Sequence, residues 1–259
     1  MKKEGNMKTA IVTGAGCDIG REVALFLGTK NYKILTHGTE IKETLKNTHQ
    51  ELEKRNIPYS TYLADFSSTD EVVATCDKIL KDEENIEVIV HAAGGSTAFG
   101  PDKITPGQLI DAVNLNLIAP MIMTHKLLPS LTDSSLIVFT SAISGIHAGW
   151  YPTDACFDAA KGGLSRFTEN MARNLGPKTR VNCIVIGLMY VDDNYKEWRA
   201  ARAEQIPMGR IAYAEDYVKC VDFFLNNEYI TGISLPLEGG WMSYNVNPPF
   251  STPQMQASS

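Results

Sequence analysis

The chain has few cysteines and no long hydrophobic run. Its 5 cysteines among 259 residues are widely spaced, which suits a reduced protein better than a disulfide framework or a zinc site. No apolar run approaches the roughly 20 residues that span a bilayer. The charged segment 1–6 lacks the apolar core of a secretion signal. We therefore expect a cytoplasmic protein with no membrane partner and no bound metal.

Positive charge is also scarce. The formal net charge is −6, from 24 Lys and Arg against 30 Asp and Glu, so a nucleic-acid partner is not expected, because it would need a clustered basic face. Hydrophobic residues make up 44% of the chain, an ordinary globular proportion. This length favours a single domain, which we place at 8–244, after an extension at 1–7 and before a Pro- and Ser-rich tail at 245–259.

Short apolar strands alternate with helical segments along the whole chain. The strands are expected at Thr9–Thr13, Tyr32–Thr36, Ser60–Ala64, Val88–Val90, Leu136–Thr140, Arg180–Ile186 and Ile233–Leu237. The helices are expected from Arg21 onward and at Glu40–Lys54, Glu71–Lys81, Leu109–Leu128, Ala155–Leu175 and Ala214–Leu225. This alternation predicts an α/β protein with a doubly wound parallel sheet of about seven strands, the Rossmann fold.

The first strand runs directly into a glycine-rich turn, Gly14–Gly20, and then into a helix. Unpaired N–H groups and the helix dipole at such a helix start both face an anion. Glycines also let the backbone approach a pyrophosphate where a Cβ would collide. The turn therefore indicates a nucleotide cofactor.

Further motifs follow this turn in a characteristic order. They are Asp65-Phe66, His91-Ala92-Ala93-Gly94, Asn116, Lys161, Ile206–Arg210, and Ile230–Gly232 through Leu237–Gly240. With the turn, in which Asp18 replaces a middle glycine, they resemble the motifs of the classical short-chain dehydrogenase/reductase family from about Lys8 to Ser243. The resemblance implies a nicotinamide-dependent oxidoreductase.

The resemblance also implies which residues form the site. The cofactor would be bound by Gly14, Gly16, Asp18, Ile19, Gly20, Asp65, Phe66, Ala92, Ala93, Gly94, Lys161, Gly187 and Met189. Asn116, Lys161, a serine and the residue at position 157 would carry the catalysis.

Position 157 departs from the family, which places tyrosine four residues before the lysine, whereas this chain has Phe157. Residues four apart on a helix share a face, so a tyrosine hydroxyl would lie beside the Lys161 ammonium. That cation would lower the pKa of the phenol and let it pass a proton to or from a substrate oxygen. Phenylalanine fits the same space but has no proton to give.

Three explanations for Phe157 stay open, in order of preference. The first is an engineered replacement of tyrosine in an enzyme that reduces a carbonyl of a bulky substrate. The second is a natural reductase of an iminium or a conjugated alkene, with or without a coupled cyclisation, because hydride addition to an iminium carbon creates no alkoxide. The third is a homologue that binds cofactor without redox chemistry.

The catalytic serine has two candidates. Ser141 directly follows the strand Leu136–Thr140, and Ser144 has the family's usual separation of thirteen positions from Phe157. We favour Ser141, because strand ends are fixed points while the loop after them can lengthen.

The end of the second strand decides between NAD(H) and NADP(H). NAD-binding relatives usually place an acid there to hold the ribose 2′-hydroxyl, whereas Gly38 or Thr39 occupies that place here. His37, Thr39 or Lys42 would contact a 2′-phosphate instead. NADP(H) is therefore favoured, with NAD(H) as the alternative.

Aromatic residues are concentrated in the segments expected to cover the substrate. The candidate substrate contacts are Ser144, Trp150, Tyr151, Tyr190 and Trp198, which suggest a roomy pocket for a small molecule or, equally, packing of a lid or subunit interface. The helix Ala155–Leu175 is apolar over a broad arc, which predicts a homo-oligomer, either a dimer or a tetramer as in relatives.

Overall fold

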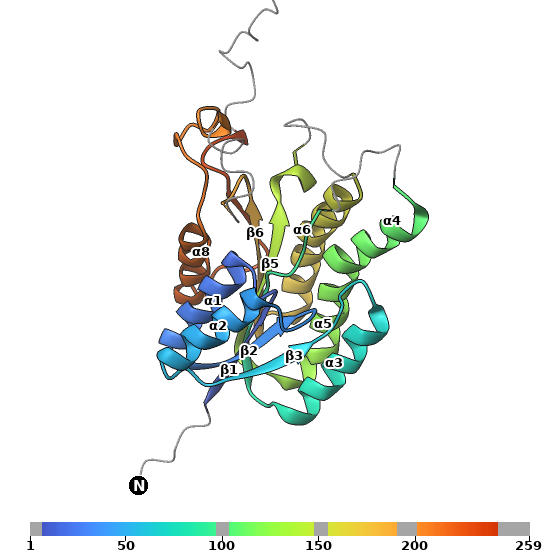
Figure 1. The fold of residues 1–259 in the computed structure, drawn as a ribbon, viewed down its shortest axis with the longest axis vertical. Coiled ribbons are helices and arrows are strands. Elements are labelled where there is room, and N and C mark those ends of the chain that lie inside the picture. The colour runs from blue at the N-terminus through green and yellow to red at the C-terminus, as the bar shows by residue number, and fades with distance from the viewer. Residues whose placement is uncertain (1–6, 97–103, 148–154, 191–200, 243–259) are drawn as a thin grey trace, which may run out of the picture.

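A computed structural model describes residues 7–96, 104–147, 155–190 and 201–242 of the chain. The predicted tail 245–259 lies outside the described residues, as does the predicted extension except for Met7. Within the described residues, every secondary-structure element belongs to a layered α/β arrangement (Figure 1).

The described strands form one seven-stranded sheet in the order β3-β2-β1-β4-β5-β6-β7. Every neighbouring pair is parallel. The strands are β1 (Lys8–Thr13), β2 (Tyr32–Gly38), β3 (Tyr59–Leu63), β4 (Ile86–His91), β5 (Leu131–Ala142), β6 (Thr179–Ile186) and β7 (Ser234–Leu237). The predicted doubly wound parallel sheet is confirmed.

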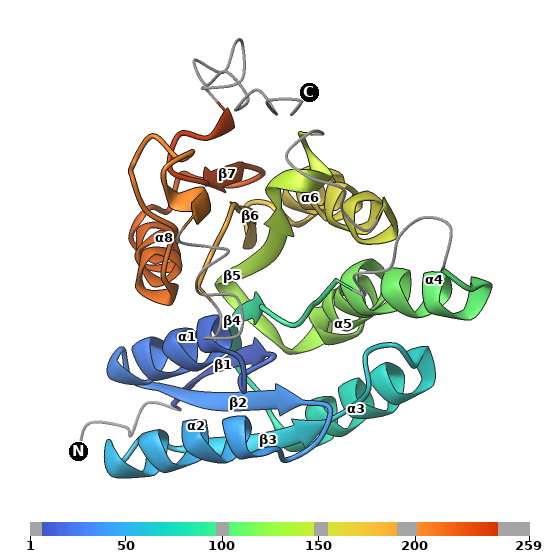
Figure 2. The ribbon, with the colours of Figure 1, turned by 45° about the horizontal axis from the view of Figure 1, so that its top comes forward.

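Helices cover both faces of this sheet (Figure 2). They are α1 (Asp18–Thr29), α2 (Glu43–Lys54), α3 (Thr69–Asp82), α4 (Pro106–Val113), α5 (Ala119–Leu127), α6 (Ala155–Leu175) and α8 (Ala214–Asn226). One apolar core joins the sheet to α3, α5 and α6, and a second joins it to α1, α2 and α8. Burial on both faces explains why the central strands read as continuous apolar runs.

The long helix expected at Leu109–Leu128 is interrupted. A π-helical turn, η1 (Asn114–Ile118), separates α4 from α5, and a 3₁₀ turn, η2 (Leu128–Ser130), follows. The physical reason is Pro120, which has no N–H to donate to the carbonyl of Asn116 four residues earlier. The Ala119 amide instead reaches the carbonyl of Asn114. Such π-turns are frequent at functional sites.

Helix α6 differs from the expectation of a broad apolar face. Leu164 and Met171 are buried in the protein's own core, and Phe167 packs against the Phe139 ring with centroids 5.6 Å apart. Apart from Ala155 and Ala159 in its first turns, its exposed positions carry polar side chains, among them Arg166 and Glu169. The apolar arc is thus used within the fold, so the homo-oligomer stays a prediction without support from this helix.

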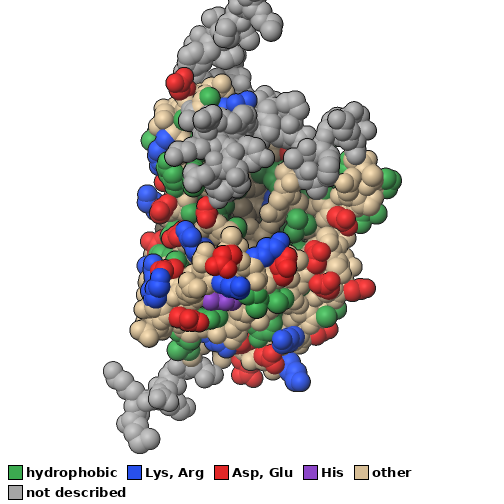
Figure 3. Space-filling view, in the orientation of Figure 1, with side chains coloured by type: hydrophobic (Ala, Val, Ile, Leu, Met, Phe, Trp, Pro, Cys, Tyr) green, Lys and Arg blue, Asp and Glu red, His purple; other side chains and the backbone are tan. Residues whose placement is uncertain are grey.

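The described surface mixes acidic and basic side chains. Figure 3 shows both kinds interspersed on the face that carries α2 and α3. The mixture of both signs agrees with the sequence, in which 30 Asp and Glu outnumber 24 Lys and Arg. Among the helices that are described, none has the length and apolarity required to cross a membrane.

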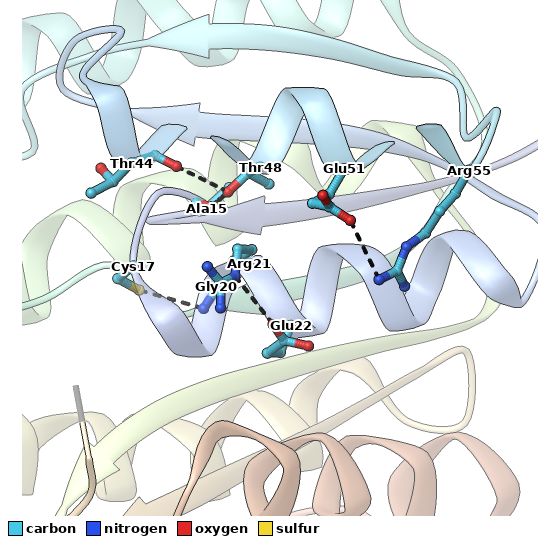
Figure 4. Close-up of polar contacts among 9 residues, drawn as sticks. All are labelled: Ala15, Cys17, Gly20, Arg21, Glu22, Thr44, Thr48, Glu51 and Arg55. Atoms are coloured by element: carbon cyan, nitrogen blue, oxygen red, sulfur yellow. Dashed lines mark hydrogen bonds and ion pairs between the residues drawn. The ribbon is translucent and has the colours of Figure 1, made fainter. Parts of the chain in front are cut away.

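The glycine turn is held by backbone contacts that leave no room for a side chain. A Cβ at Gly20 would lie only 2.2 Å from the carbonyl oxygen of Gly14. Beside it, the Thr48 hydroxyl of α2 donates to the carbonyl oxygen of Ala15 at 2.8 Å (Figure 4). The turn is therefore fixed between α1 and α2.

We expect Gly20→Ala to destabilise the protein by about 1–3 kcal/mol, since backbone atoms of the turn must move to admit the methyl group. Gly107→Ala in α4 is the matched control, because a Cβ there meets nothing within 4 Å, and it should be neutral or slightly stabilising. Urea unfolding followed by circular dichroism measures both free energies. Equal stability of the two variants would show that the turn is looser than described.

Candidate functional site

The candidate site lies at the carboxyl ends of the strands, where the sheet order reverses between β1 and β4. Such a switch point is the usual ligand crevice of an open α/β sheet. A cavity of about 280 Å³ opens there. Its lining includes Gly14, Gly16, Cys17, His37, Gly38, Thr39, Glu40, Lys42, Thr44, Phe66, Ala92, Ala93 and Gly94. The structure thus brings together the glycine turn and the ends of β2, β3 and β4, as the sequence predicts.

The glycine turn begins helix α1 in the geometry that an anion requires. Gly14 has a φ of 67°, in the left-handed region that favours glycine. Cys17 is the N-cap residue, and its Sγ accepts a hydrogen bond from the Gly20 amide at 3.4 Å. Asp18 is the first residue of α1, and Ile19 is buried beneath the turn. The start of α1 therefore faces the cavity with its backbone.

His37 connects the turn to two strands. Its Nδ1 accepts from the Gly14 amide at 3.4 Å, so the other ring nitrogen, Nε2, donates to the carbonyl oxygen of Ala64 at 3.1 Å. The ring stacks on Phe66 with centroids 3.9 Å apart. Burial lowers the pKa of His37 to about 4, so the ring is neutral at physiological pH. Both ring nitrogens are thus used to hold the cavity wall.

The polar groups at the end of β2 surround the mouth of the cavity. Thr39 is exposed there, and Lys42 Nζ pairs with Glu40 Oε1 at 3.0 Å. At the end of β3, the Asp65 carboxylate accepts from the Ser67 amide at 2.9 Å. The Glu40 carboxylate is therefore balanced by a lysine that lines the same cavity.

A second cluster lies beside the cavity and contains the predicted catalytic residues. Lys161 Nζ is buried and donates to the carbonyl oxygen of Thr140 at 2.9 Å. Burial lowers the pKa of Lys161 to about 8. The same ammonium lies 5.6 Å from the centroid of the Phe157 ring. The helical spacing of four residues thus brings the two side chains together as expected.

Asn116 completes this cluster from the π-helical turn. Its Nδ2 donates to the carbonyl oxygens of Gly95 and Ala112, both at 2.9 Å, and its Oδ1 accepts from the Gly95 amide at 3.1 Å. A Cβ at Gly94 would lie 2.8 Å from both Asn116 Oδ1 and Lys161 Nζ. Gly94 is therefore packed between the two predicted catalytic residues.

The placement of Ser141 argues against the sequence-based preference for it. Ser141 is fully buried, and its hydroxyl donates to the carbonyl oxygen of Lys161 at 2.7 Å. It also accepts from the Ser165 hydroxyl at 3.3 Å. Its strand-end position directs the side chain into α6 rather than toward a ligand. Ser144, half-buried in the 3₁₀ turn η3 (Ile143–Gly145), is the better placed of the two serines.

The remaining predicted residues follow β6. The Gly187 amide donates to the carbonyl oxygen of Leu237 at 2.9 Å, and a Cβ at Gly187 would lie 2.8 Å from Glu238 Cβ. Met189 is buried, and the Tyr190 ring centroid lies 5.8 Å from that of Tyr213. Trp150, Tyr151 and Trp198 fall outside the described residues.

Two threonines that sequence reasoning did not assign to the site hold its parts in place. The Thr13 hydroxyl accepts from the Ala93 amide at 3.0 Å and so joins β1 to the segment after β4. Thr140 binds Lys161 through its carbonyl oxygen and the Tyr217 hydroxyl, 2.7 Å away, through its Oγ1. The sequence could have indicated both through their position, since each ends a predicted strand directly before a predicted site residue, Gly14 or Ser141.

Three other cavities in the described structure contain none of the predicted site residues in their linings. A larger cavity of about 460 Å³ lies at the opposite, amino edge of the sheet, against residues such as Lys8, Tyr32 and Glu87. The residues described contain no cluster of three or more His, Cys, Asp and Glu that would hold a metal ion.

Reductases are among the known proteins of similar sequence. A 3-oxoacyl-(acyl-carrier-protein) reductase of Pseudomonas aeruginosa is 28% identical over 247 residues, covering 90% of this chain and 96% of that protein. A dihydromonapterin reductase of Escherichia coli is 27% identical over 240 residues, covering 89% and 95%.

Solved structures share the fold. A short chain dehydrogenase from Burkholderia cenocepacia, in complex with NADP, matches with a TM-score of 0.83 at 21% identity over 91% of this chain and 98% of that chain. The family model described as short chain dehydrogenase matches residues 8–202, which is well over half of the sequence. This protein therefore belongs to the short-chain dehydrogenase family of oxidoreductases.

Proposed function

We propose that this protein is an NADP(H)-dependent reductase that acts on a small molecule. The observation that carries the proposal is the glycine-lined cavity at the switch point with the buried Lys161 cluster beside it. A protein that kept the fold only as a scaffold would have no need for a buried ammonium next to a ligand cavity, because burying a charge is costly.

The residues present fit a dinucleotide. The start of α1 would hold the pyrophosphate, since its backbone amides face the cavity and Gly14 and Gly16 carry no side chain there. Lys161 gives one N–H to Thr140, which leaves N–H donors of its ammonium for sugar hydroxyls. The bound cofactor would supply a hydride, and the protein would place the acceptor carbon.

The preference for NADP(H) rests on Lys42. This lysine lines the cavity at the end of β2, and its partner Glu40 is an exposed side chain that a 2′-phosphate would displace. The NADP-bound relative from Burkholderia cenocepacia is consistent with this choice. His37 and Thr39 would shape the same corner of the cavity.

We expect NADPH to bind more tightly than NADH, and Lys42→Ala to weaken NADPH binding by about tenfold, or about 1.4 kcal/mol, with little effect on NADH. Lys46→Ala on the same helix is the control, because Lys46 pairs with Glu43 and does not line the cavity. Titration followed by cofactor fluorescence measures all six affinities, those of the wild type and the two variants for each cofactor. Absence of binding of either cofactor at millimolar concentration would refute the proposed function.

We also expect the free energy of unfolding to fall at acidic pH, because His37 in the cavity wall then becomes protonated. Its folded pKa of about 4 lies below the ordinary value of 6.5, so its stabilising contribution is complete above pH 6.5 and is lost as the pH falls toward 4. That contribution amounts to about 3 kcal/mol. His91, with a pKa lowered to about 3 by burial, acts in the same direction.

Comparison with His37→Phe isolates the contribution of His37 to the pH dependence of stability, because phenylalanine can still stack on Phe66 but does not titrate. The loss of unfolding free energy between pH 7 and pH 4 should be smaller in His37→Phe than in the wild type by about 3 kcal/mol. The exposed His125→Gln is the control. Identical pH dependence of His37→Phe and wild type would contradict the neutral, buried state of His37.

A further inference from the structure

Within the described part of the chain, the two predicted catalytic side chains nearest Lys161, Phe157 and Ser141, provide no acid for a substrate oxygen. Phe157 occupies the helical position four residues before Lys161, 5.6 Å from its ammonium, and carries no ionisable group. The Ser141 hydroxyl is buried and donates to the carbonyl oxygen of Lys161. Neither side chain can protonate a ligand in the cavity.

The neighbouring polar groups do not replace that acid. Lys161 is buried and donates one N–H to the Thr140 carbonyl, and in the proposed function its remaining N–H groups would hold the sugar hydroxyls of the cofactor. Asn116 uses both atoms of its amide on the backbone of Gly95 and Ala112. Ser144 is half-buried, and a serine hydroxyl can donate a hydrogen bond but is too weak an acid to give up its proton at neutral pH.

This arrangement restricts the chemistry of the acceptor. A ketone that gains a hydride becomes an alkoxide, which needs a proton and a stabilising donor at the oxygen. A conjugated alkene gives an enolate with the same requirement. An imine that is protonated in water has no such need, because the hydride neutralises a charge that the substrate already carries.

We propose that the natural substrate class is a C=N compound that enters as its iminium ion, a proposal that rests on the proposed reductase function. The substrate carbon gains the hydride of the reduced nicotinamide, and the π electrons of the C=N bond become the nitrogen lone pair. The products are a neutral amine and the oxidised cofactor. No proton is taken from the protein, and the amine is protonated later by water.

The Phe157 ring suits such a substrate in a second respect. The face of an aromatic ring attracts cations within about 6 Å of its centroid. The Nζ atom of Lys161 already lies within that distance of the Phe157 ring centroid. The ring would therefore attract an iminium ion bound beside it, whereas it has no hydrogen-bond donor for a ketone oxygen.

The first experiment compares two substrates of the same shape, 3,4-dihydroisoquinoline as the imine and α-tetralone as the ketone. With NADPH, the imine should be reduced at least about 10²-fold faster in kcat/KM, the typical value of a missing general acid. The rate should rise as the pH falls and follow the protonation of the imine. Reduction of both at similar rates would overturn the proposal.

The second experiment restores the hydroxyl. Phe157→Tyr should raise ketone reduction by about 10²- to 10⁴-fold and change imine reduction only a few-fold. Lys46→Ala, which lies away from the cavity lining, is the control and should leave the reduction of both substrates unchanged. An equal gain of Phe157→Tyr on both substrates would show that the imine also needs an acid and would contradict the proposal.

The third measurement does not depend on turnover. Calorimetric binding of 1,2,3,4-tetrahydroisoquinoline, a cation at neutral pH, should be about 3- to 10-fold weaker in Phe157→Leu than in the wild type. If NADPH binds but neither the imine nor this amine is recognised, the substrate class is wrong and the reductase function stands. If NADPH does not bind, the proposed function itself fails.

Discussion

The buried ammonium of Lys161 is the constraint on which the active end of the fold depends. A charge removed from water must find a polar partner, and here that partner is the carbonyl oxygen of Thr140, near the end of β5. The bond fixes α6 against the sheet, and the Ser141 hydroxyl strengthens the same junction by donating to the Lys161 carbonyl. Gly94 and Asn116 then pack around the ammonium. One buried cation thus organises three segments that are far apart in sequence.

The other half of the site depends on neutral contacts. Close backbone packing of Gly20 on Gly14 shapes the turn, and the His37 ring ties that turn to β3 through two hydrogen bonds. Because both ring nitrogens make hydrogen bonds to the backbone, the histidine holds the cavity wall in place. These contacts within the protein form the cavity wall without help from a ligand, and cofactor sites are usually pre-formed in this way.

Sequence reasoning predicted most of the fold, because strands buried on both faces leave a strong apolar signal. It missed the break in the long helix at Leu109–Leu128, although Pro120 was visible, since helical periodicity continues through the π-turn. It also preferred Ser141, because the end of a strand can be placed from sequence while the direction of its last side chain depends on what packs there. The broad apolar arc of α6 predicted a homo-oligomer, but contacts such as that of Phe139 with Phe167 use part of this arc inside the fold, so the oligomer stays a prediction.

The central claim is that this site supports hydride transfer without a proton from the protein. The most direct test reduces 3,4-dihydroisoquinoline with 4-deuterated NADPH and, separately, with unlabelled NADPH in D₂O at matched protonation of the imine. The account predicts one deuterium at the product carbon from the labelled cofactor, and a rate in D₂O equal to that in H₂O. A substantially slower reaction in D₂O would show that a proton moves in the rate-limiting step and would contradict the account.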